Sequence, residues 1–254
     1  MNFMFPIPSK IKEFIEHSKL TEITIGCSDS QVIKIEKDNN IYFLKMMKKG
    51  KIIKEYKKLM WLSGKLNVPK VVLFYQSDYD YLTTEGMPGK MLCDEYYLKN
   101  PNLNILKDAF WAIYNVDSSN CPFDMSNSKL LLEARYNVEN KIRTTDDLKQ
   151  ETKDRFKDIY NLLEYLEQNN YEENLIFSFG DISLTNLFAI DDKFVGFIDV
   201  GECGLADKWL DLAVCEKSII RNYGKEYVDK FYELLGIVPD REKIDYHLLL
   251  LELI

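Results

Sequence analysis

The feature that most constrains this chain is a β-hairpin pattern with polar side chains at its open end. Residues 187–190 and 194–198 have the composition of two short strands, and the Asp-Asp-Lys between them favours a turn. Asn186 precedes the first strand and Asp199 follows the second, so pairing of the strands places their side chains opposite each other. Asp181 lies five residues before Asn186 in a loop, and its carboxylate is expected at the same end. Because oxygen ligands of this kind suit Mg²⁺, the sequence predicts a magnesium site there.

The composition indicates a globular protein. The 254 residues allow one large domain or two lobes, and a hydrophobic content of 46% is sufficient for a sizeable core. The balance of 33 basic and 41 acidic residues gives a formal charge of −8, which disfavours nucleic-acid binding and is compatible with a cationic small ligand. The N-terminus does not resemble a signal peptide, and no apolar run has the length of a membrane span. Five scattered cysteines without a C-x-x-C pair indicate a reducing compartment, so we expect a cytoplasmic protein without membrane contact.

The N-terminal third has the pattern of an antiparallel sheet. A short helix is predicted from Ser9, as its N-cap, to His17. Strands are predicted at residues 21–25, 31–36 and 41–46, with a turn at residues 37–40. The Gly-Cys-Ser-Asp-Ser loop between the first two strands could bring backbone N–H groups to a phosphate, although an ordinary hairpin loop explains it as well.

Two charged residues occupy positions that the apolar pattern assigns to the interior. Alternation along the third strand places Lys45 on the same face as Ile41 and Phe43. Glu55 lies on the apolar side of the helix predicted at residues 51–62. A lysine among apolar residues needs an anionic partner, so we predict an ion pair between Lys45 and Glu55. The pair is either a phosphate-binding device, as in kinases, or a structural salt bridge.

The rest of the chain reads as mostly helical. Strands are expected at residues 71–75 and 79–85, before a break at Gly86-Met-Pro-Gly89. Helices are predicted at residues 104–115, 129–141 and 154–166, and the polar stretch 143–150 is expected to be a surface connection. The final residues, 239–254, are predicted to form a helix that stays apolar to its end. Such an end indicates a docked terminus, whether for stability or for ligand binding.

The Asp-x4-Asn spacing and the second Asp beyond a hairpin resemble the catalytic loop and metal aspartate of protein kinases. The chain resembles the aminoglycoside phosphotransferases more closely. Ile198-Asp-Val-Gly201, Gly204-Leu-Ala-Asp-Lys-Trp209 and Asp211-Leu-Ala213 are similar to the 3′-phosphotransferase branch of that family, and the resemblance extends from about residue 20 to the end. Two positions depart from the family pattern: Phe179 stands where the family has histidine, and Glu202 where close relatives have arginine.

This resemblance implies an α+β, two-lobed, protein-kinase-like fold. The N-terminal lobe, residues 1–86, would be an antiparallel sheet that binds the nucleotide. The larger, mostly helical C-terminal lobe, residues 87–254, would carry catalysis and substrate binding. We also expect a monomer or a weak dimer.

The resemblance also assigns roles to residues. Asp181 would orient the substrate hydroxyl and accept its proton, while Asn186 and Asp199 would hold Mg²⁺. The phosphoryl donor, ATP or GTP, would be bound by Ser28, Phe43, Lys45, Glu55, Thr84 and Gly86. The substrate would be contacted by Asp146, Glu151, Glu252 and the terminal carboxylate of Ile254. For the loop acids and the chain end, a solvated surface and a tail packed for stability are the alternatives.

The expected function is therefore transfer of the γ-phosphoryl group of ATP or GTP to a hydroxyl, the 3′-hydroxyl by resemblance, of an aminoglycoside antibiotic, which would give resistance. A kinase of another small hydroxylated metabolite would share the nucleotide residues and differ at Asp146, Glu151 and Glu252. A catalytically silent nucleotide-binding protein is the alternative outside the enzymes. It is motivated by the departures at Phe179 and Glu202. The intact residues Lys45, Asp181, Asn186 and Asp199 argue against it.

Overall fold

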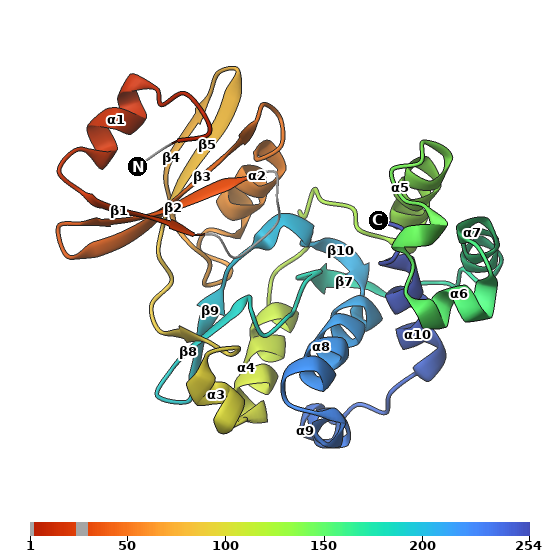
Figure 1. Cartoon of the computed structure of the whole chain (residues 1–254). Helices are drawn as coiled ribbons and strands as arrows, with labels where there is room; N and C mark the ends of the chain where they lie inside the picture. Colours follow the sequence, from red (N-terminus) through yellow and green to blue (C-terminus); the bar gives the residue numbers. More distant parts are fainter. Residues whose placement is uncertain (1–2, 24–29) are drawn as a thin grey trace. The chain divides into compact units, whose positions relative to one another are not determined.

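The computed structural model describes residues 3–23 and 30–254. The chain divides into two compact units, and each is described here by itself (Figure 1). The first unit comprises residues 1–89 together with 195–201, and the second comprises residues 90–194 together with 202–254. Among the described residues, no helix combines the length and apolar character that crossing a membrane requires.

The first unit is built on a five-stranded antiparallel sheet with the strand order β1-β2-β3-β5-β4. Its elements are α1 (Ser9–Ile15), β1 (Lys19–Ile23), β2 (Gln31–Lys37), β3 (Asn40–Lys48), α2 (Ile53–Leu62), β4 (Val71–Gln76) and β5 (Tyr79–Glu85). The strands predicted at residues 31–36, 41–46, 71–75 and 79–85 are confirmed within one or two residues at each end. The first strand begins earlier than predicted, at Lys19, and residues 24–25 lie outside the described part of the chain.

Side-chain alternation along β3 explains how the sheet buries one face. Leu44 and Met46 are fully buried in a core that also contains Ile33 and Ile35 of β2, whereas Lys45 points to the other face. The turn between β2 and β3 places Asp38 and Asn39 at φ 49° and 61°. Aspartate and asparagine tolerate this left-handed backbone better than most residues, which is why the turn falls there.

Helix α1 packs its fully buried Ile11 against the same core, but Ser9 is not its N-cap. Pro8 occupies that position, and no side chain caps the helix. The Pro8 carbonyl instead accepts from the N–H groups of Ile11 and Lys12 at 3.0 and 2.9 Å. The prediction of a serine cap is therefore wrong, because a carbonyl one residue earlier already starts the helical hydrogen bonding.

The second unit is mostly helical, and with the sheet of the first it confirms the α+β class. Its helices are α3 (Glu95–Lys99), α4 (Leu103–Tyr114), α5 (Asn127–Glu139), α6 (Gln150–Phe156), α7 (Ile159–Gln168), α8 (Lys208–Asn222), α9 (Val228–Leu235) and α10 (Arg241–Leu250). Its strands β7 (Leu175–Ser178) and β10 (Gly204–Asp207) pair antiparallel. A further sheet has the order β6-β8-β9, from β6 (Lys90–Met91), β8 (Leu187–Ile190) and β9 (Lys193–Phe197), and the chain passes into the first unit within β9.

The hairpin turn predicted between β8 and β9 is present. Asp191 and Asp192 adopt φ 47° and 60°, as a two-residue turn of this kind requires. The strands on either side match the predicted ones to within a residue at each end. The pattern of turn residues between short apolar runs therefore predicted this local structure correctly.

The helix predicted at residues 154–166 is instead two helices. Lys157 adopts φ 69°, a left-handed conformation that ends α6. Asp158 then caps α7 by accepting from Asn161 N at 2.9 Å. The apolar periodicity continues across the break, since Phe156 and Ile159 both contribute to one hydrophobic core, and this continuity concealed the boundary.

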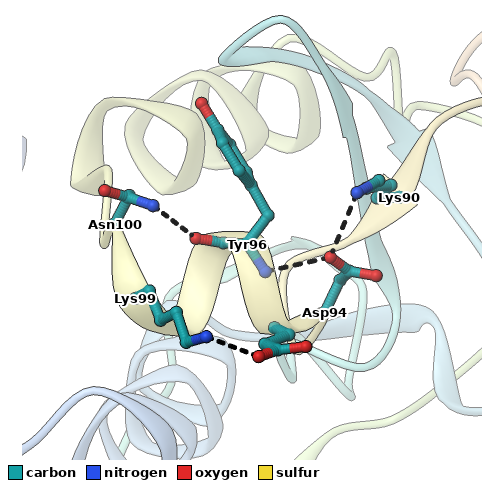
Figure 2. Close-up of polar contacts among 6 residues, drawn as sticks. Lys90, Asp94, Tyr96, Lys99 and Asn100 are labelled. Carbon is teal, nitrogen blue, oxygen red and sulfur yellow. Dashed lines mark hydrogen bonds and ion pairs between the residues drawn. The ribbon is translucent and has the colours of Figure 1, made fainter.

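Helix α3 shows how capping defines a short helix after the break at residues 86–89 (Figure 2). Asp94 accepts from Tyr96 N at 3.0 Å and lies 3.4 Å from Lys90 Nζ. The hydrogen bond from Tyr96 N, helped by the charge of Lys90, lowers the pKa of Asp94. At the other end, Asn100 Nδ2 donates to the Tyr96 carbonyl at 2.9 Å and closes the helix.

Candidate active site

Asp181 and Asn186 lie in contact on the loop between β7 and β8. Asn186 Nδ2 donates to Asp181 Oδ2 at 2.8 Å and to the Asp181 carbonyl at 3.1 Å. Asn186 is 7% exposed, whereas the Asp181 side chain is half-buried. Since Nδ2 faces Asp181, the amide Oδ1 points away; it accepts a long hydrogen bond of 3.5 Å from Thr185 Oγ1 and has a second lone pair with which to bind a metal ion. The structure thus brings Asp181 and Asn186 together, as the five-residue spacing between them predicted.

Helix α8 holds the backbone of this loop on both sides of Asp181. Asp211 Oδ2 accepts from Phe179 N at 2.9 Å, and its Oδ1 accepts from Gly180 N at 2.7 Å. Ser218 Oγ, seven residues further along the same helix, accepts from Leu184 N at 2.9 Å. Residues seven apart lie two turns apart on one helix face, so one face of α8 fixes the loop at two points.

Asp211 is fully buried, and its ionisation reflects that burial. Loss of hydration raises the pKa of Asp211 to about 6, against the two N–H hydrogen bonds, which favour the charged form. The negative charge of Asp181 raises the pKa in the same direction. Asp211 begins the Asp211-Leu-Ala213 motif, but its role was not predicted from the sequence. A carboxylate between the apolar residues Leu210 and Leu212 was the available signal.

Gly180 is required by a close approach of two backbone segments. It adopts φ 81°, and a Cβ atom at this position would lie 2.1 Å from the carbonyl oxygen of Glu202. Only glycine avoids both the left-handed strain and this contact. The neighbouring Phe179 is fully buried, and its N–H donates a hydrogen bond to Asp211 Oδ2. The loop therefore has defined backbone anchors with phenylalanine in place of the family histidine.

In the first unit, the predicted ion pair is confirmed. Lys45 Nζ, on β3, lies 2.7 Å from Glu55 Oε2 in the first turn of α2. Burial raises the pKa of Glu55 and outweighs the opposing effect of Lys45, and the negative charge of Asp199 raises it further. Lys45, Glu55 and Asp199 therefore belong to one electrostatic group within this unit.

Asp199 lies on a segment that the first unit holds by its backbone. Phe197 N donates to the Asn67 carbonyl at 3.0 Å, and Lys58 Nζ donates to the Gly201 carbonyl at 2.5 Å. Asp199 is exposed and adopts φ 59°, in the left-handed region. Non-glycine residues hold this conformation where their surroundings impose it, and such positions cluster at functional sites. The predicted pairing of Asn186 with Asp199 links the two units and stays a prediction.

The remaining nucleotide-binding candidates adjoin each other where described. Phe43 of β3 is the register partner of Thr84 of β5, and Gly86 N donates to the Ile41 carbonyl at 2.8 Å. A Cβ at Gly86 would lie 3.2 Å from the Phe43 ring, so this end of β5 packs closely on β3. Ser28 lies outside the described residues.

The four substrate candidates gather around the N-terminal end of α6 and the end of the chain. Glu252 Oε2 accepts from Lys149 N, and its Oε1 accepts from Thr152 Oγ1, both at 3.0 Å. The backbone oxygen of Ile254 accepts from Arg143 Nη2 at 2.7 Å. The side chains of Asp146 and Glu151 are exposed nearby. The basic and hydroxyl partners Arg143, Lys149 and Thr152 were not identified from the sequence, since about a hundred residues separate each from its partner.

These residues are typical of an enzyme of phosphoryl transfer: a loop carboxylate beside an asparagine, a strand lysine paired with a helix glutamate, and a further aspartate after a hairpin. Residues 19–247 match the model of the phosphotransferase enzyme family. The chain belongs to that family, and it is a kinase-type phosphotransferase.

The relatives include aminoglycoside 3′-phosphotransferases. The one from Enterococcus faecalis is 36% identical over 259 residues, covering 97% of this chain and 98% of that protein. The one from Campylobacter jejuni is 32% identical over 238 residues, covering 90% and 94%.

Solved structures share the fold. An aminoglycoside 3′-phosphotransferase of type VIII matches with a TM-score of 0.82 at 24% identity, covering 93% of this chain and 94% of that one. The aminoglycoside phosphotransferase APH(3'')-Id from Streptomyces rimosus, in complex with ADP and streptomycin, matches with a TM-score of 0.77 at 22% identity, covering 92% of each chain. The fold predicted by resemblance is therefore confirmed.

Proposed function

We propose that this chain is an aminoglycoside 3′-phosphotransferase that transfers the γ-phosphoryl group of ATP or GTP to the 3′-hydroxyl of an aminoglycoside antibiotic and so gives resistance to it. The observation that carries the proposal is the contact of Asp181 with Asn186 on a loop that Asp211 anchors. The 3′-phosphotransferases among the relatives, at up to 36% identity over nearly the whole chain, support the substrate class.

Asp181 is the catalytic residue of this proposal. Its Oδ2 receives the Asn186 hydrogen bond, which orients the carboxylate so that the other oxygen can accept the proton of the substrate hydroxyl. Because the transition state of phosphoryl transfer is loose, the rate gain comes mainly from positioning and charge neutralisation. A carboxylate on an anchored loop suits that task, since its position is fixed before the substrate binds.

We assign Mg²⁺ to Asn186 and Asp199. Both offer hard oxygen donors: the Asn186 amide directs Oδ1 away from Asp181, and the Asp199 carboxylate is exposed on a backbone held in the left-handed region. When bound, the ion neutralises negative charge on the phosphates of the donor.

We assign nucleotide binding to residues 1–86 and catalysis with substrate binding to residues 87–254. Lys45 contacts phosphate oxygens and Glu55 orients it, a role supported by their 2.7 Å pairing. Phe43 stacks on the purine, the backbone of Thr84 to Gly86 contacts its edge, and Ser28 covers the phosphates. Asp146, Glu151, Glu252 and Ile254 contact substrate ammonium groups. We further propose that the protein acts in the cytoplasm, a location supported by the scattered cysteines without a C-x-x-C pair, and that it is a monomer or weak dimer.

The test is a coupled assay of nucleoside diphosphate release with ATP and with GTP across a panel of aminoglycosides. Drug-dependent release, with phosphate found on the 3′-hydroxyl by NMR, is expected. Asp181→Asn should lower turnover by about 10² to 10⁴ while both ligands still bind. Asp191→Asn is the matched control, because this aspartate lies on the exposed hairpin turn in a backbone conformation that asparagine also adopts.

The other outcomes identify the alternatives. Release that no aminoglycoside stimulates would indicate a kinase of another small hydroxylated metabolite. Nucleotide binding without any turnover would indicate a silent nucleotide-binding protein.

A further inference from the structure

The carboxylate of Glu252 is held by three donors from one short segment, residues 149–152. Lys149 N donates to Oε2 at 3.0 Å, and Thr152 Oγ1 donates to Oε1 at 3.0 Å. Lys149 Nζ lies 3.1 Å from Glu252 Oε1, and the longer distance of 3.8 Å separates it from Glu151 Oε1. Lys149 is the N-cap of α6 and Thr152 lies in its first turn, whereas Glu252 follows the end of α10 by two residues; both helices are labelled in Figure 1. We call Lys149, Thr152 and Glu252 the Glu252 cluster.

The three donors differ in how firmly they are placed. The Lys149 N–H belongs to the backbone, and Thr152 is buried at 3% exposure, so both fix the orientation of the carboxylate. The Lys149 ammonium ends a long side chain that is 41% exposed, whereas the Glu252 side chain is 10% exposed. The ammonium is thus the charged and more exposed partner, and its removal leaves the other two donors in place.

A substrate ammonium that contacts Glu252 needs the same oxygen lone pairs and the same negative charge. Lys149 supplies an ammonium of the same chemical kind at 3.1 Å. The carboxylate is therefore neutralised by the chain itself before any ligand binds, and a cationic substrate must displace Lys149 to make a full ion pair.

We propose that Lys149 is a specificity-determining residue that competes with substrate ammonium groups for Glu252. The proposal rests on the proposed function, because it takes an aminoglycoside as the cation that displaces Lys149. It predicts that Lys149 weakens aminoglycoside binding. The gain on its removal should be modest, about three- to tenfold, because the pair is partly exposed to water.

The chain offers a matched control four residues after Lys149, within α6. Lys153 Nζ donates to the backbone carbonyl of Asp146 at 3.0 Å, not to Glu252. Lys149→Met, at the N-cap of α6, and Lys153→Met, within α6, remove the same charge and keep a similar side-chain length. A general effect of net charge on a polycation would appear in both variants, whereas competition at Glu252 would appear only in the first.

The experiment measures KM and kcat at low and high salt for an aminoglycoside that the wild type turns over. The proteins compared are the wild type, the two methionine variants, Glu252→Gln and the double variant Lys149→Met/Glu252→Gln. Lys149→Met should lower the aminoglycoside KM about three- to tenfold at low salt, with kcat and the nucleotide KM unchanged. The gain should shrink at high salt and vanish in the Glu252→Gln background. Lys153→Met should not reproduce this Glu252-dependent gain.

Equal KM changes in both methionine variants, or no change in Lys149→Met, would overturn the competition while leaving the proposed function intact. If Glu252→Gln fails to fold, the comparison of the two lysine variants and its salt dependence still decides. Absence of wild-type turnover with every aminoglycoside would overturn the proposed function, and the competition with it.

Discussion

The buried carboxylate of Asp211 gives the sharpest test of how this fold holds its catalytic loop. Asp211→Asn keeps the shape but leaves one oxygen acceptor for the two N–H groups of Phe179 and Gly180, which lie 2.9 and 2.7 Å from the carboxylate. One of these N–H groups then loses its hydrogen bond to residue 211, and the loop that carries Asp181 shifts; Gly180 N keeps a longer bond of 3.2 Å to Ser178 Oγ. We expect kcat at pH 7.5 to fall about tenfold to hundredfold, because small displacements of a catalytic group are costly.

The ionisation of Asp211 also predicts that the free energy of unfolding depends on pH, and the same variant tests this. The folded-state pKa of Asp211 is raised from 3.8 to about 6, so between these values the folded protein binds the proton more tightly than the unfolded chain. Wild-type stability is therefore lost as the pH rises across this window, and Asp211→Asn, which cannot ionise, lacks this loss. The free energy of unfolding of the wild type minus that of the variant should fall by about 2–3 kcal/mol between pH 4 and 7.

Urea unfolding at half-unit pH steps measures this difference directly. Asp229→Asn, an exposed aspartate in the first turn of α9, controls for the removal of a carboxylate. A difference that stays flat, or that rises with pH, would refute the view that burial dominates the ionisation of Asp211.

Three further predictions concern the other anchors of the site. In a double-mutant cycle measured by nucleotide titration, Lys45→Met and Glu55→Gln together should lose less nucleotide-binding free energy than the sum of the two single losses. The expected coupling is about 0.5–3 kcal/mol, and strict additivity would mean that the two residues act separately. Asp199→Asn should abolish the Mg²⁺-dependent part of nucleotide affinity in calorimetry with the thermal midpoint unchanged, and an unaltered affinity would remove the metal assignment. In urea unfolding, Gly180→Ala should lower the free energy of unfolding by about 1–3 kcal/mol more than Gly64→Ala does. Both glycines have φ near 80°, but only a Cβ at Gly180 would meet a carbonyl oxygen. Equal decreases in the two variants would mean that the backbone at Gly180 moves freely.

Local patterns predicted much of the first unit. Alternation along β3 identified its buried face, and the misplaced charges of Lys45 and Glu55 predicted a pair that forms at 2.7 Å. Turn residues located the hairpins at Asp38-Asn39 and Asp191-Asp192 because aspartate and asparagine accept a positive φ. These features depend on neighbours in sequence or on the period of one element, which a single sequence displays.

The structural features that were not predicted from the sequence have a different physical cause. The end of α6 depends on the left-handed backbone of Lys157, which no local composition signals. The loop anchors Asp211 and Ser218 act from more than thirty residues away on α8, and periodicity reports only that this helix is buried. For the candidate site, the Asp181–Asn186 contact could be predicted from spacing, but what fixes it in place could not.

The difference between what the sequence displays and what distant contacts decide also changes how the net charge should be interpreted. A formal charge of −8 made a cationic ligand reasonable, yet that sum says nothing of which carboxylates are available. Glu55 lies against Lys45, and Glu252 lies against Lys149, so each of these functional candidates has an internal cation within 3.1 Å. Affinity for a polycation then depends on how easily such a partner leaves, which varies with its exposure and with salt. Screening a surface charge such as Lys153 and displacing Lys149 are thus different events, and only the second should be coupled to Glu252.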